Sequence, residues 1–140
     1  MNWKLIFQLS LFGLAMGIAT VFVIPSKIEP AFWLVIFLYC AYVIAKCSGG
    51  KNFLHGLLLG IANSIWITGT HILLFDRYVD GHAQEVAMTQ TVPVPLSTQG
   101  KMAIIAPVFG LLFGVIMGLF AFIAGKLVKT PPAPESKATA

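Results

Sequence analysis

The chain has 140 residues, of which 58% are hydrophobic and only 10% are charged, whereas a soluble domain carries about 25% charged residues. The net charge is +4, but the apolar runs leave no room for a soluble domain, so this charge does not indicate nucleic-acid binding. Cys40 and Cys47 are too far apart for a redox C-x-x-C motif and match no zinc pattern. No cofactor motif is present, and we expect no cofactor.

The first apolar run covers residues 5–24. It is longer than the apolar part of a secretory signal, which is about 7–15 residues, so we expect a retained membrane span rather than a cleaved leader. Gly13 and Gly17 form a GxxxG motif, which lets membrane helices pack closely.

The second apolar run covers residues 31–47. Glu29 and Pro30 suit the start of a helix, because an acid is favourable near the positive end of the helix dipole and proline is tolerated in the first turn. Gly49 and Gly50 follow the run and are typical of a helix C-terminus.

The third apolar run, residues 52–75, is the only one with polar side chains at its middle. A helical period places small and polar residues in one arc; these are Gly56, Gly60, Asn63, Ser64, Thr70 and His71. Such a face contacts either a neighbouring helix or a wet cavity. We favour interhelical hydrogen bonding over a polar path for a substrate, because no acid or base lies at mid-membrane to couple transport to protons.

Residues 76–100 form one sizeable loop between the third and fourth runs. Four residues of metal-ligand type are gathered at the end of the third run and in this loop, namely His71 on the helix and Asp76, Asp80 and His82 in the loop. Their spacing matches no standard metal signature. We therefore interpret the acids as solvated and the histidine as hydrogen-bonded, and expect no metal.

The fourth apolar run, residues 102–127, carries a stripe of small residues at four-residue steps. The stripe consists of Ala106, Gly110, Gly114 and Gly118. Membrane helices associate where small residues let their backbones approach, so the stripe predicts a partner helix, either in the same bundle or in another chain. Pro107 either kinks this helix or marks its start.

Lysine and arginine are distributed unequally between the two sides of a four-span arrangement. The side with both termini carries Lys4, Lys46, Lys51, Lys126, Lys129 and Lys137, and the other side carries Lys27, Arg77 and Lys101. The positive-inside rule therefore places both termini in the cytoplasm and the 76–100 loop outside. We predict an all-α four-helix transmembrane bundle in a bacterial inner membrane, followed by a disordered cytoplasmic tail over residues 130–140.

Three short stretches suggest a family resemblance: residues 24–34, His55-Gly56 and residues 63–68. They resemble a group of small bacterial four-span membrane proteins, and this resemblance implies no activity. Small multidrug transporters are similar in size and span number but rely on a glutamate in the first helix. Here that helix has Gln8 and no acid, so their function is not carried over.

These observations favour a non-enzymatic membrane protein with a structural or accessory role. Its glycine stripes would pack against a second copy or a larger membrane complex within the lipid bilayer. One alternative is a small transporter or channel that uses the polar face of the third helix. A membrane enzyme is the third possibility, but no nucleophile–base pair is visible.

Overall fold

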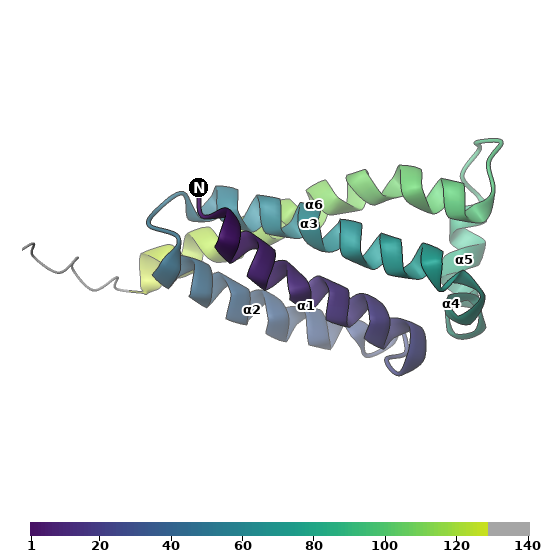
Figure 1. The fold of residues 1–140 in the computed structure, drawn as a ribbon, viewed down its shortest axis with the longest axis horizontal. Coiled ribbons are helices and arrows are strands. Elements are labelled where there is room, and N and C mark those ends of the chain that lie inside the picture. The colour runs from purple at the N-terminus through teal and green to yellow at the C-terminus, as the bar shows by residue number, and fades with distance from the viewer. Residues whose placement is uncertain (129–140) are drawn as a thin grey trace, which may run out of the picture.

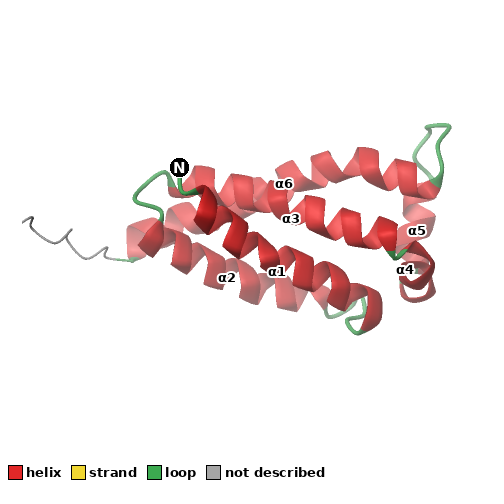
Figure 2. Cartoon of the chain, in the orientation of Figure 1, coloured by secondary structure: helices red, strands yellow, loops and turns green. Residues whose placement is uncertain are grey.

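The structure is a computed structural model and describes residues 1–128; the prediction for the tail, 130–140, lies outside the described residues. Residues 1–128 form six helices and no strand (Figure 2). The helices are α1 (Trp3–Phe22), α2 (Glu29–Cys47), α3 (Asn52–Leu73), α4 (Phe75–Gly81), α5 (Ala83–Gln90) and α6 (Thr98–Leu127). The all-α prediction is confirmed.

Four of the helices, α1, α2, α3 and α6, are long and apolar enough to cross a membrane. The protein is therefore a multi-pass membrane protein by the length and composition of its helices. Figure 1 shows that residue 1, the α2–α3 turn and the last turn of α6 lie at one end of the bundle, here called the terminal end. The α1–α2 turn, α4 and α5 lie at the opposite end, here called the loop end.

Helix α3 is the centre of the bundle, because it packs against both α6 and α1, whereas α2 packs chiefly against α6. The α3–α6 contact is made by glycines of both helices. A Cβ atom built on Gly60 would collide with the backbone of Gly114, and one built on Gly56 would lie 2.7 Å from the Cα atom of Gly118. The stripe of α6 is thus used inside the bundle, where it lets the two backbones touch.

The α1–α3 contact also depends on glycine. A Cβ atom built on Gly13 would lie 2.9 Å from the Cα atom of Asn63, and one built on Gly17 would collide with the hydroxyl of Thr70. The GxxxG motif predicted from the first apolar run therefore receives polar side chains of α3.

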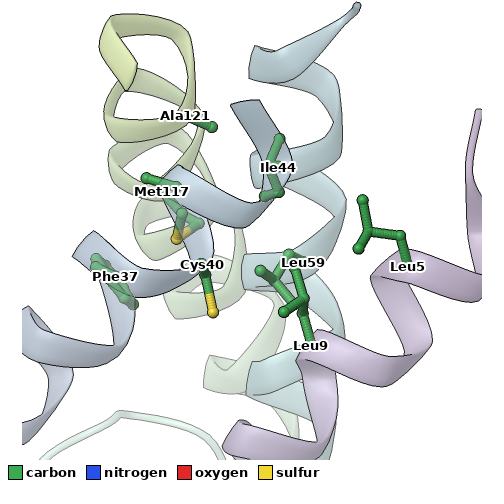
Figure 3. Packing of buried hydrophobic residues seen from close by; sticks show 9 residues of the cluster. Leu5, Leu9, Phe37, Cys40, Ile44, Leu59, Met117 and Ala121 are labelled. Carbon is green, nitrogen blue, oxygen red and sulfur yellow. The ribbon is translucent and has the colours of Figure 1, made fainter. Parts of the chain in front are cut away.

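The buried apolar core lies in the half of the bundle next to the terminal end. Figure 3 shows side chains from all four long helices meeting there. The cluster consists of Leu5, Leu9, Phe37, Cys40, Ala41, Ile44, Leu59, Met117 and Ala121. Cys40, Leu59, Met117 and Ala121 have no exposed surface, so α2 and α6 are tightly packed in this half.

Two sequence expectations change in detail. The 76–100 loop contains helices α4 and α5, which the sequence did not predict. Helix α6 is continuous through Pro107, so the proline does not mark its start. The helix begins at residue 98 because Ser97 caps it, its side chain accepting a hydrogen bond from the Gly100 amide at 3.2 Å.

Candidate functional site

A cavity of about 750 Å³ lies between α2, α3 and α6, and α4 and α5 contribute to its wall at the loop end. It exists because α2 and α6, which touch near the terminal end, diverge toward the loop end (Figure 1). Its volume is within the range of small-molecule sites, roughly 300–1,000 Å³. It is the candidate functional site, here called the loop-end cavity.

The inner part of the loop-end cavity is aromatic. The Phe37 ring lies edge-on to three other rings, with centroid distances of 5.8 Å to Trp33, 6.5 Å to Phe113 and 6.1 Å to Phe120. All four side chains line the cavity, and Phe37 also belongs to the buried core. The aromatic cluster is therefore where the cavity ends and the packed terminal half begins.

One side of the cavity is open. Leu34 of α2 and Phe109 and Phe113 of α6 line it, yet they keep 52%, 51% and 44% of their surfaces exposed. These residues lie within helices that are apolar enough to span a membrane. The opening between α2 and α6 is therefore lateral, and in a bilayer it faces lipid.

The polar part of the cavity lies toward the loop end. Its polar side chains there are Ser26, Glu29, His71, Tyr78, Glu85 and Thr89. The Trp33 Nε1 atom donates a hydrogen bond of 3.0 Å to Glu29 Oε1, which holds the indole beside the carboxylate. Within residues 1–128, no lysine or arginine lines the cavity.

Outside the four long helices, two groups of this polar part have shifted pKa values. Burial, together with the negative charges of Glu85 and Glu29, raises the pKa of Tyr78 to about 12, so its phenol stays protonated at neutral pH. Partial burial opposes ionisation of Glu85, but its interactions with the Ser26 hydroxyl, its own backbone and His82 outweigh burial and lower the pKa of this carboxyl.

Three rings form a stack that attaches α4 to α3. Tyr78 lies between His71, at a centroid distance of 4.1 Å, and His82, at 4.4 Å, with interplanar angles of 20° and 11°. Thr20 of α1 shares a hydrogen bond of 2.9 Å with Nε2 of His71. The tyrosine also packs against Val21 and Val86 in a second buried cluster. This ring stack joins α1, α3, α4 and α5 at the end of the cavity.

The polar face predicted for α3 is divided between the cavity and helix contacts. Asn63, Ser64 and His71 line the cavity. Asn63 and Ser64 also face Gly13 and Gly110, respectively, so packing and cavity lining occur on the same helix face.

Thr70 and Ala106 have surroundings that differ from those predicted for them. The Thr70 hydroxyl donates to the Trp66 and Ile67 carbonyls at 3.0 and 2.8 Å and faces Gly17 rather than the cavity. Ala106, predicted as part of the packing stripe, lines the cavity instead.

The four residues considered as metal ligands are not brought together. His71 and His82 are separated by the Tyr78 ring, and Asp76 and Asp80 are exposed. Among residues 1–128, no group of three or more His, Cys, Asp or Glu side chains is arranged to hold a metal ion.

Glu29, Trp33 and Phe37 were not predicted as site residues, although their spacing in the sequence is a signal. Residues at four-residue steps lie on one face of a helix, and this face of α2 combines an acid with two aromatic rings. Glu85 and Tyr78 had no comparable signal, because their position depends on how α4 and α5 fold back over the bundle.

Comparisons of this chain with protein-family models, with curated proteins and with solved structures find no match. Its function is therefore inferred from the loop-end cavity itself.

Proposed function

We propose that this protein is a non-enzymatic membrane protein that binds an amphipathic small molecule in the loop-end cavity. The observation that carries the proposal is the loop-end cavity of about 750 Å³, which combines an aromatic inner part, a polar end and a lateral opening between α2 and α6. This polarity matches a molecule with an apolar body and a polar head. Such a molecule partitions into a bilayer and would enter between the two helices without crossing water.

The positive-inside bias supports an orientation in which the loop end faces the outside of a bacterial inner membrane. In this orientation the cavity takes its ligand from the outer leaflet. The polar end then lies near the headgroups, and the aromatic cluster around Phe37 lies deeper in the hydrocarbon.

The packing of the α6 glycine stripe supports ligand binding over an assembly role. Gly110, Gly114 and Gly118 pack against α3 of the same chain, so this stripe is not free for a second copy or a larger complex. The packed core at the terminal half, with Leu59 and Met117 fully buried, likewise gives no support to an open channel. A binding protein of the small-transporter type is the function that the cavity supports best.

Filling the cavity tests the proposal. Ala106 is small, half-buried and lines the cavity, so Ala106→Phe is expected to occupy the binding volume without removing a hydrogen bond. The probe is a neutral long-chain alcohol with a diazirine group, photoactivated in nanodiscs that contain the protein. We expect wild-type adducts on cavity-lining residues of α2 and α6 and at least about tenfold fewer in the variant, as expected for a loss of about 1.4 kcal/mol or more.

The matched control is Ala103→Phe, which adds the same ring to an exposed position of α6 outside the cavity. Its adducts should resemble those of the wild type. Adducts spread evenly over the lipid-exposed faces, or equal labelling in Ala106→Phe, would show that the cavity does not bind amphipathic molecules.

A further inference from the structure

We infer that the loop-end cavity selects lipophilic cations, with an ammonium or phosphonium group near Glu29 and Glu85 and an apolar body along the aromatic cluster. This inference rests on the proposed binding function and names the class of its ligand. It is carried by charge complementarity within one cavity, together with the aromatic side chains that follow the acids inward.

The two carboxylates come from separate elements. Glu29 is the first residue of α2 and Glu85 lies in the first turn of α5, and both line the cavity. Tyr78 lines the same part of the cavity, and the negative charges of both acids contribute to the raised pKa of its phenol. The loop end therefore brings two acids from distant parts of the sequence to one polar site.

The positive side chains of the loop end do not neutralise this site. Lys27 and Arg77 are exposed and do not line the cavity, and the Lys101 ammonium donates a hydrogen bond of 2.9 Å to the Gln90 carbonyl. Attraction of a cation in a partly desolvated site is stronger than in water. An anionic headgroup would instead meet two carboxylates and no basic partner.

Aromatic rings extend the preference for a cation into the cavity. Trp33 is held beside Glu29 by its hydrogen bond, and Phe37 follows one turn further along α2. Ring faces attract cations, tryptophan most strongly. A lipophilic cation would thus have favourable partners along its whole path from the polar end to Phe37.

The test uses two ions of nearly equal size and shape but opposite charge, tetraphenylphosphonium and tetraphenylborate. Binding of each is measured by equilibrium dialysis against the full chain in phosphatidylcholine nanodiscs, with empty nanodiscs subtracted. We expect saturable binding of the cation and none of the anion. The double substitution Glu29→Gln and Glu85→Gln should weaken cation binding by about tenfold or more, because it removes two ion pairs that each contribute up to about fivefold.

The control is the double substitution Asp76→Asn and Asp80→Asn. It removes the same formal charge from the same end of the bundle at exposed residues that do not line the cavity. Cation affinity should stay within about twofold of the wild type, since surface charges at a distance are screened by salt. Glutamine at position 29 keeps an acceptor for Trp33, so helix α2 should fold normally in the test variant.

Four outcomes would overturn the inference. If both ions bind equally and Ala106→Phe abolishes the binding of both, the cavity is a binding site that does not select by charge. An equal loss in both double variants would assign the effect to overall charge rather than to the cavity. If neither ion binds but the neutral alcohol labels the cavity specifically, only the cation preference is overturned. If neither ion binds and the alcohol does not label the cavity specifically, the proposed binding function is overturned as well.

Discussion

Gly60→Ala is expected to destabilise the protein by about 2 kcal/mol, the net of an overpacking cost of about 3 kcal/mol and a gain of about 1 kcal/mol in helix propensity. The added methyl group would meet the Cα and amide nitrogen of Gly114. Because these are backbone atoms, no side-chain rotation can relieve the collision, and α3 must move away from α6. The measurement is reversible unfolding in mixed detergent micelles, followed by circular dichroism.

The same helix supplies the control. At Gly69 of α3 an added Cβ atom would meet nothing within 4 Å, so Gly69→Ala should be neutral or stabilising by up to about 1 kcal/mol. Equal effects at the two glycines would mean that helix propensity, rather than the α3–α6 contact, determines the result. An unchanged stability in Gly60→Ala would show that the two backbones do not touch.

Tyr78→Ala is expected to release α4 and α5 from the bundle. The Tyr78 side chain is 7% exposed, lies between two imidazole rings and packs on Val21 and Val86. Removing a large buried aromatic side chain costs about 3 kcal/mol, which corresponds to roughly hundredfold faster amide exchange in a segment that opens locally. The readout is hydrogen exchange by mass spectrometry over residues 75–90, compared with α1 and α3.

Tyr78→Phe is the conservative counterpart, because it keeps the ring and removes only the hydroxyl. Exchange over residues 75–90 should then stay within about threefold of the wild type if stacking dominates, since ring contacts rather than a buried hydrogen bond hold the segment. An equally large increase in amide exchange in both variants would show that the phenol oxygen, rather than the ring, anchors the segment. Unchanged exchange in Tyr78→Ala would contradict the anchoring role of the ring stack.

The four long helices were predictable because a bilayer imposes simple requirements on sequence. A span needs roughly 20 apolar residues, and close packing needs small residues at helical spacing. The stripe through Gly110, Gly114 and Gly118 therefore identified the tightest helix contact of the fold. Its partner could not be read from the stripe alone, because glycines in α1 and α3 offered equally suitable surfaces.

Helices α4 and α5 escaped prediction for a physical reason. They have 7 and 8 residues, and isolated helices of this length are marginal in water. They are held by the packing of Tyr78 and Val86 on the rest of the bundle. Such contacts between distant residues are absent from local sequence patterns.

The site could be predicted only in part for a related reason. Asn63, Ser64 and His71 were recognisable as polar residues in an apolar helix, and they line the cavity. The cavity itself results from the divergence of α2 and α6, which no single helix encodes. The acids Glu29 and Glu85 both line it because the α1–α2 turn and α5 lie at the same end of the bundle.

The packing of Cys40 gives this bundle a built-in reporter of its own motion. Its thiol has no exposed surface between α2 and the rest of the core, whereas Cys47 is exposed at the end of the same helix. Because a maleimide must reach a sulfur atom to react with it, the closed bundle reacts at Cys47 alone. In a Cys47→Ser chain, the rate of alkylation at Cys40 would report how often α2 separates from the core. An alkylation rate that rises with added cation would connect the proposed binding to movement of α2.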